Sequence, residues 1–179
     1  MRKNKAFTLI ELLVVIAIIG LLSSVVLVSM GGVRQKARVA KALVELDQIV
    51  LAINLYYQNT ETAPPHDHSW SDACEKAALG SGNFSPKPSG WAGSYMVWPK
   101  NPWDYEYHFE RHPPLCPLSP PYSISVNGVP QDAAQMIDNE ADDGNFGTGH
   151  VRWSGNRLEY NCGRFDLPDA DTHFTSCIP

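Results

Sequence analysis

The sequence predicts an α+β fold, in which one long N-terminal α-helix packs against a small antiparallel β-sheet. Proline is absent before Pro64, and several short segments after residue 100 alternate apolar and polar side chains. The 13 glycines and 14 prolines, most of them after residue 60, favour turns in the second part. A chain of 179 residues suffices for one ordinary domain and an appendage.

The first half of the expected helix is apolar on all sides. Between Phe7 and Val33 the only charged residue is Glu11, and three basic residues lie within residues 1–6. A helix of this length can cross a hydrocarbon core of about 30 Å. We therefore expect residues 7–33 to be a membrane-spanning half-helix, with its basic start in the cytoplasm and the remainder of the chain outside.

The helical pattern continues beyond the apolar segment. Apolar residues recur at spacings of 3, 4, 3 and 4 and form an apolar stripe: Leu43, Leu46, Val50, Ile53 and Tyr57. We expect an amphipathic half-helix at residues 34–60, which needs an apolar surface to pack against. The sequence "QNTETAPP" is a plausible stop for this helix.

The globular head, residues 61–179, has the patterns of short strands. Residues 105–109 and 122–126 alternate apolar and polar side chains, and residues 151–160 predict a hairpin around "SGN". A short helix is expected near residues 71–79. Three or four antiparallel strands would cover the apolar stripe of the half-helix.

A lone carboxylate in an apolar segment is costly unless it has a partner. The small residue Ala6 precedes the apolar segment, and cleavage between Ala6 and Phe7 would expose an α-amine on Phe7, which is cationic near neutral pH. Glu11 can meet this amine within one chain or in a neighbouring chain. The second arrangement would link assembly to charge neutralisation. The alternative is that Glu11 only favours the positive end of the helix dipole, an effect of about 0.3–1 kcal/mol.

The sequence "KAFTLIELLVVIAIIGLL" resembles the class III signal and N-methylation segment of type IV pilins and type II secretion pseudopilins, and the likeness extends over residues 1 to about 60. The resemblance implies that residues 1–6 are a leader peptide. It also implies that prepilin peptidase cleaves before Phe7 and N-methylates it, which makes Glu11 the fifth mature residue. The chain departs from the family in having Ala6 where glycine is usual.

The head resembles the major pseudopilin of type II secretion at two places. The sequence "WPKNPWDYEYHF" is similar to a Pro-Lys-Asp-Pro-Trp segment, although Asn101 replaces the Asp and Asp104 stands where glycine is common. The sequence "NEADDGNF" is similar to an acidic calcium loop.

The acidic stretch has its own chemistry. Between His112 and Val151 there is no Lys or Arg, but there are five carboxylates: Asp132, Asp138, Glu140, Asp142 and Asp143. Crowded carboxylates repel unless a cation lies among them, and calcium binds 6–8 oxygens. The expected ligands of this cofactor are Asn127, Asp138, Asp142 and Asp143. The pattern is not an EF-hand, because Gly149 stands where the bidentate Glu belongs. The alternative is a solvated acidic loop.

The even number of cysteines in an exported head predicts disulfides rather than buried free thiols. Of the three possible pairings, the favoured one joins Cys162 to Cys177, which would hold the C-terminal tail, and Cys74 to Cys116.

These features predict a structural subunit of a type II secretion pseudopilus, polymerised through its N-terminal helix. The expected partners are other copies of the chain, related minor pilins, prepilin peptidase, an inner-membrane assembly platform and, before assembly, membrane lipid. We expect the chain first in the inner membrane, with one membrane crossing and its head outside the cytoplasm, and then in a periplasmic pseudopilus or an extracellular pilus.

Other functions remain open. A type IV pilus subunit for adhesion, motility or DNA uptake is the main alternative, and a membrane-anchored calcium-binding protein or enzyme is a remote one. No catalytic residue is expected, because G-x-S-x-G and H-E-x-x-H motifs are absent. The net charge of -5 argues against nucleic acid as a partner.

Overall fold

The computed structural model describes residues 7–66, 72–111, 113–118, 122–167 and 176–177, and it leaves the side chains of 26–30, 72–73 and 176–177 undescribed. The chain forms two compact units, Met1–Ala37 and Arg38–Pro179. The hydrophobic core belongs to the second unit, since its residues run from Val39 to Leu167.

Helix α1 spans Leu9–Thr60 and has 52 residues, which confirms the prediction of one long helix. Six residues of its second half are almost fully buried and recur at spacings of 3 and 4: Val39, Ala42, Leu46, Ile49, Ile53 and Tyr56. The predicted stripe is therefore correct, with its centre on these residues. The helix ends where Glu61 adopts a φ of 55°, outside the helical region.

In the first half of α1, every residue from Leu9 to Val25 is exposed. The sequence predicts a membrane crossing over residues 7–33. Within the part of the chain that the structure describes, no helix combines the length and the apolar content that a membrane crossing requires.

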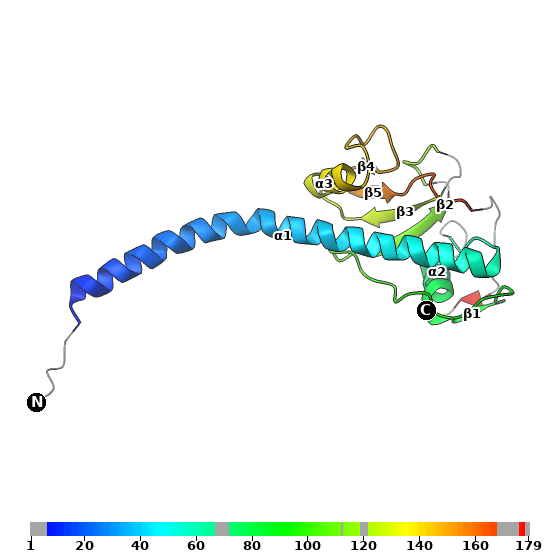
Figure 1. Ribbon diagram of the computed structural model, residues 1–179, viewed down its shortest axis with the longest axis horizontal. Helices are drawn as coiled ribbons and strands as arrows, with labels where there is room; N and C mark the ends of the chain where they lie inside the picture. The colour runs from blue at the N-terminus through cyan, green and yellow to red at the C-terminus, as the bar shows by residue number, and fades with distance from the viewer. Residues whose placement is uncertain (1–6, 67–71, 112, 119–121, 168–175, 178–179) are drawn as a thin grey trace, which may run out of the picture. The chain divides into compact units, whose positions relative to one another are not determined.

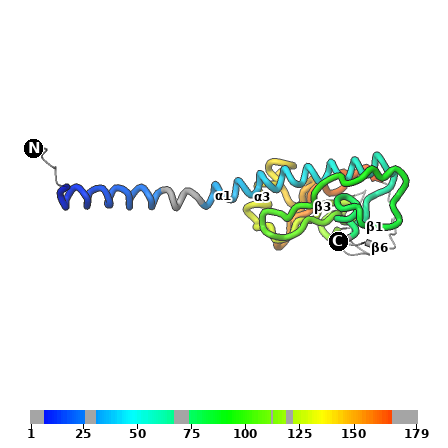
Figure 2. Tube along the Cα trace, turned by 90° about the horizontal axis from the view of Figure 1, so that it is seen from below, coloured from blue at the N-terminus to red at the C-terminus, as the bar shows by residue number. Residues whose placement is uncertain are grey.

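The head contains a four-stranded antiparallel sheet in the order β2-β3-β5-β4 (Figure 1). Its strands are β2 (Tyr107–Arg111), β3 (Tyr122–Asn127), β4 (Arg152–Ser154) and β5 (Arg157–Tyr160). These bounds confirm the predicted strands and hairpin. A separate two-stranded sheet pairs β1 (Phe84–Ser85) with β6 (Ser176–Cys177) (Figure 2).

The register of the sheet separates apolar from polar side chains. Phe109 lies opposite Ile124, and Val126 lies opposite Leu158, so the apolar members share one side. They are fully buried and belong to the same core as the second half of α1, which runs along the sheet in Figure 1. The hydroxyl of Tyr107 donates a hydrogen bond of 2.8 Å to the Glu45 carboxylate of α1. The sheet thus supplies the partner that the amphipathic half-helix needs.

The opposite side of the sheet carries a buried polar network. Glu159 is fully buried, and its Oε2 accepts hydrogen bonds from the hydroxyls of Ser123 and Ser125. The guanidinium of Arg157 bridges Glu159 and Glu110. Because its charges are paired and hydrogen-bonded, this network can remain buried within the head.

Three shorter helical segments complete the head. Helix α2 (Asp72–Lys76) and the following π-turn η1 (Ala77–Ser81) confirm the helix expected near residues 71–79. Helix α3 spans Gln131–Ala141 and is an element that the sequence analysis does not predict. The segment "NEADDGNF", which is similar to an acidic calcium loop, begins in the last turn of this helix and continues into the loop that follows it. The buried residues Ala133, Ala134 and Ile137 give α3 an apolar side that packs into the core.

The predicted disulfide pairing is wrong. Cys116 is bonded to Cys162, with their Cα atoms 5.6 Å apart, and Cys74 is disulfide-bonded as well. The physical reason is the path of the chain after β5, where the N–H of Gly163 donates to the carbonyl of Tyr122. This contact brings the end of β5 beside the segment that precedes β3. Cys177 lies elsewhere, since its backbone pairs with Phe84 in the small sheet.

A pair of identical substitutions on α1 tests this packing. Leu46→Ala is expected to lower the free energy of unfolding of the unit Arg38–Pro179 by about 2–5 kcal/mol, because Leu46 is fully buried. Leu51→Ala is expected to change it by less than about 0.5 kcal/mol, because Leu51 is 58% exposed. Urea unfolding measures both values, and equal losses would contradict the described packing.

Candidate functional site

The N-terminus of α1 carries a capping box, which involves Glu11. The Glu11 Oε2 accepts hydrogen bonds from the Thr8 N–H at 2.9 Å and from the Thr8 hydroxyl at 2.7 Å. The Glu11 N–H lies 3.2 Å from the Thr8 hydroxyl oxygen, which accepts from it. This reciprocal Thr-x-x-Glu arrangement satisfies backbone donors that the first helical turn leaves free. Thr8 is therefore a functional residue that the sequence reasoning missed, although its spacing from Glu11 is readable.

The capping box does not occupy the whole carboxylate. All hydrogen bonds that Glu11 accepts within the described residues go to Oε2, which leaves Oε1 as an open acceptor. Phe7 is 78% exposed, one residue before the cap. Ala6 lies outside the described residues. The pairing of Glu11 with an amine on Phe7 therefore stays a prediction, and the geometry leaves one oxygen for it.

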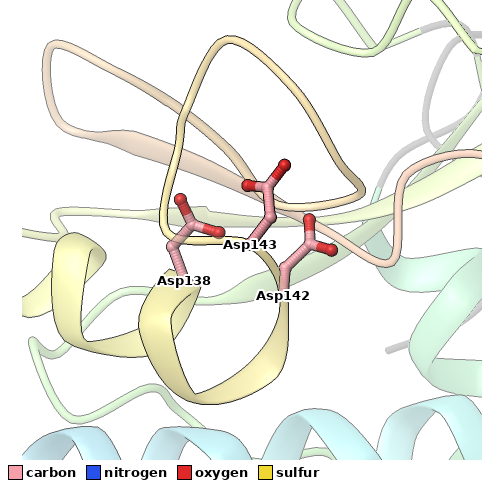
Figure 3. Close-up of side chains that lie close together, drawn as sticks. All are labelled: Asp138, Asp142 and Asp143. Carbon is pink, nitrogen blue, oxygen red and sulfur yellow. The ribbon is translucent and has the colours of Figure 1, made fainter.

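A second cluster of carboxylates lies at the C-terminal end of α3 (Figure 3). Asp138 belongs to the last turn of the helix, and Asp142 and Asp143 follow it. One oxygen of each of these residues lies within 4.8 Å of those of the other two. Figure 3 shows the three carboxylates on the same side of the helix end, below the arch of the following loop.

Two of the three carboxylates organise that loop. Asp142 Oδ2 accepts hydrogen bonds from the N–H groups of His150 and Val151. Asp143 accepts from the Asn145 N–H at 2.9 Å and from the Thr148 hydroxyl at 2.6 Å, and this hydroxyl lowers the pKa of the Asp143 carboxyl. These contacts close the loop over the cluster.

Gly149 allows the loop to approach Asp142. Its φ is +70°, a left-handed conformation that glycine adopts readily. A Cβ atom at this position would lie 2.0 Å from Asp142 Oδ2. Any other residue would therefore push the loop away from the cluster.

Asp138 differs from its neighbours because it is fully buried. Neither of its carboxylate oxygens has a well-formed hydrogen bond. Burial raises the pKa of Asp138, and the charges of Asp143 and Asp142 add to this increase; the Gly144 backbone and the Arg152 guanidinium oppose it. A charged carboxylate that is buried without a well-formed hydrogen bond is destabilising. Binding of a proton or of a cation would therefore stabilise Asp138.

The donor set fits a hard cation. It consists of carboxylate oxygens, which calcium prefers, and the backbone carbonyls of a loop can add further oxygens. The interaction with Arg152 is the competing way to balance the charge, because this side chain is also largely buried. A cation bound among the three aspartates would relieve both the burial of Asp138 and the repulsion between the carboxylates.

Asn127 does not belong to this cluster, contrary to the prediction. It ends β3 opposite Arg157, which in turn lies opposite Ser154. The cluster contacts the other end of this hairpin, at Val151. Ser154, which is level with Asn127, and Val151, which contacts the cluster, are three residues apart on extended chain, or about 10 Å. The prediction failed because the segment between Asn127 and Asp138 forms a helix, which carries the two residues apart.

Two descriptions of known protein families match successive parts of the chain. The prokaryotic N-terminal methylation motif matches residues 1–27, and the family described as type II secretion system protein G matches residues 29–136, more than half of the chain.

Several bacterial relatives carry the name type II secretion system core protein G. The chain is 31% identical to the protein of Vibrio cholerae over 111 residues, 61% of this chain and 72% of that protein. It is 28% identical to the protein of Pseudomonas aeruginosa over 147 residues, which are 81% of this chain and 96% of that protein. With the protein of Dickeya chrysanthemi the identity is 25% over 151 residues, 83% and 90% of the two chains.

The raised pKa of Asp138 predicts how pH affects the metal-free unit Arg38–Pro179. Its contribution to stability is fully present below the ordinary pKa of 3.8 and is lost as the pH rises through the raised value. Asp138→Asn removes this loss, so the variant should gain stability over the unmodified chain as the pH rises. Urea unfolding at several pH values, with a chelator present, measures the difference.

Glu140→Gln is the matched control, because Glu140 lies on the same helix and is exposed. This variant should keep the pH dependence of the unmodified chain. If Asp138→Asn also keeps it, the carboxyl of Asp138 is not the group responsible.

Proposed function

Since this chain belongs to the type II secretion system protein G family, we propose that it is a structural subunit of a pseudopilus, polymerised through its N-terminal helix. The observation that carries the proposal is the first half of α1. Its large apolar side chains from Leu9 to Val25 are between 46% and 79% exposed in a single chain. Such a surface needs a covering, and neighbouring copies in a fibre supply it.

Processing prepares this helix for assembly. Prepilin peptidase removes residues 1–6 and methylates the new N-terminus at Phe7. The N-terminal methylation motif that matches residues 1–27 supports this step. Cleavage after Ala6 leaves Thr8 and Glu11 in the mature chain, so the capping box persists in the fibre.

The new amine on Phe7 then pairs with Glu11 of an adjacent copy. The open Glu11 Oε1 supports this contact, because the capping box engages only Oε2. In an apolar fibre core, a charged pair is far less costly than an isolated carboxylate. The pairing would fix the axial position of each new subunit relative to the last.

Before assembly, the apolar half-helix is stored in the inner membrane with its head outside the cytoplasm. In this state lipid covers the residues that neighbouring copies cover later. The further partners are prepilin peptidase, an inner-membrane assembly platform and related minor pilins. A type IV pilus subunit for adhesion, motility or DNA uptake has the same helical requirements; the family match over residues 29–136 favours the pseudopilus.

Calcium bound by Asp138, Asp142 and Asp143 stabilises the head. The buried carboxylate of Asp138 supports this assignment, because neither of its oxygens has a well-formed hydrogen bond and a cation would stabilise its charge. The family consists of structural subunits, and no reaction is required from the head. Calcium would therefore act by holding the loop after α3 rather than by taking part in chemistry.

Glu11→Gln separates the two roles of Glu11. Glutamine can accept the hydrogen bonds of a capping box, but it cannot neutralise an amine. We expect the full-length variant to be inserted and processed normally but to form at least about tenfold fewer fibres, since losing a charged pair in an apolar environment costs more than 1.4 kcal/mol. Electron microscopy of sheared fibres and immunoblotting of the membrane fraction measure the two steps.

Thr8→Val is the matched control for the capping box. It removes the hydroxyl of Thr8 but leaves the charge of Glu11, so it should reduce fibre formation far less. Normal fibre formation by Glu11→Gln would contradict charge pairing and leave Glu11 with the capping role alone.

Calcium removal tests the proposed metal site. Adding calcium at about 100 times its Kd should raise the Tm of the chelator-treated unit Arg38–Pro179 by about 5–10 °C. The Asp138→Asn variant should respond much less, because it loses the buried charged ligand. If the unit Arg38–Pro179 has the same Tm in calcium and in chelator, the calcium proposal is wrong.

A further inference from the structure

The second unit has few exposed large hydrophobic side chains, and most of them gather in one place. Within its described residues they are Val44, Leu51, Leu55, Val97 and Tyr105. Leu51 and Leu55 of α1 line one hollow of about 290 Å³ together with Val97 of the segment before β2. Val44 precedes Leu51 by seven residues, so it lies on the same side of the helix.

Val97 protrudes from a segment that the rest of the head holds in place. The N–H groups of Tyr95 and Met96 donate to the carbonyl of Leu79, at 2.9 and 3.1 Å. On the other side of Val97, the indole N–H of Trp98 donates to the carbonyl of Tyr107 at 3.2 Å. Val97 itself is 90% exposed. A large apolar residue fixed in this position is already ordered for a contact and would lose little conformational entropy on binding.

A second hollow, of about 360 Å³, lies on the other side of Val97. It is lined by Gly80, Ser81, Ser94 and Trp98, with Met96 and Val97 shared between the hollows. Among the described residues that line it, the one with a charge is Lys76, which is ion-paired with Glu106. The described residues that line the first hollow carry no charge.

We propose that this surface, the Val97 patch (Val44, Leu51, Leu55, Met96 and Val97), is a subunit contact that binds a second copy of this chain in the fibre. The inference rests on the proposed function, because it requires a polymer. Its neutral lining suits an identical partner. The full sequence has a net charge of -5, and removal of residues 1–6 takes away three basic residues and leaves -8, so copies in the fibre repel one another at charged surfaces. An uncharged apolar patch offers a contact without that repulsion, and it gives an anionic lipid or nucleic acid nothing to pair with.

Within the second unit, the exposed apolar residues of α1 lie on one side of the helix. They are Val44, Leu51 and Leu55, at intervals of 7 and 4 residues that return to the same side of an α-helix. A second copy that packs along this part of α1 would contact all three side chains.

Photo-cross-linking in fibres tests the contact directly. In full-length chains that carry Val97→benzoylphenylalanine, irradiation of intact fibres should join two copies of the chain, and mass spectrometry should place one end of the bond at position 97. Adducts to lipid or to a different protein, or no adduct in fibres that do form, would overturn the proposal.

A charge in the patch tests its importance for assembly. Val97→Asp and Leu51→Asp should each lower fibre yield by about tenfold or more, because an aspartate would be buried against an apolar surface. The Tm of the head should move by no more than about 2 °C, since both positions are exposed. Ser154→Asp, at an exposed position on β4, is the control and should assemble normally.

The outcomes separate this inference from the proposed function. Fibres that form normally from Val97→Asp and Leu51→Asp would overturn the patch as a contact and leave the pseudopilus subunit intact. If the unmodified chain formed no fibres under the same conditions, both proposals would fail together.

Discussion

The apolar surface of α1 has to be kept from water along the whole helix, and a single chain covers only its second half. There the buried residues from Val39 to Tyr56 pack against the sheet, so the head is built around the helix rather than attached to its end. The side chains from Leu9 to Val25 have no such cover. In the proposed function, lipid and then other copies of the chain cover these side chains, and their burial favours polymerisation.

The carboxylates of Glu11 and Asp138 have different surroundings in this chain. Glu11 is held by Thr8 in a capping box that leaves one oxygen open. Asp138 is fully buried without a well-formed hydrogen bond, between aspartates that are already committed to the loop. For both carboxylates we propose a cationic partner: the amine of a neighbouring copy for Glu11, and a metal ion for Asp138. Assembly and head stability would then depend on similar electrostatics at two separate places.

Periodicity in the sequence was sufficient for the second half of α1 and for the strands, because both are amphipathic and pack on one side. It did not reveal α3, whose signal is the short apolar set of Ala133, Ala134 and Ile137. That omission also misplaced Asn127, since a helix separates residues that a loop would let meet. The Cys116–Cys162 bond depends on the segment after β5 lying beside the start of β3, a tertiary contact with no local sequence pattern. The role of Thr8 could have been predicted from the sequence, because a threonine three residues before a glutamate at the start of a helix is typical of a capping box.

The central claim is that a new amine at Phe7 meets the carboxylate of Glu11 when subunits join. The most direct measurement is the intact mass of the chain recovered from fibres, together with the sequence of its N-terminus. The account predicts a chain that begins at Phe7 with one methyl group on its nitrogen. Fibres built from chains that still carry residues 1–6 would contradict it, because no amine would then be present at Phe7 to pair with Glu11.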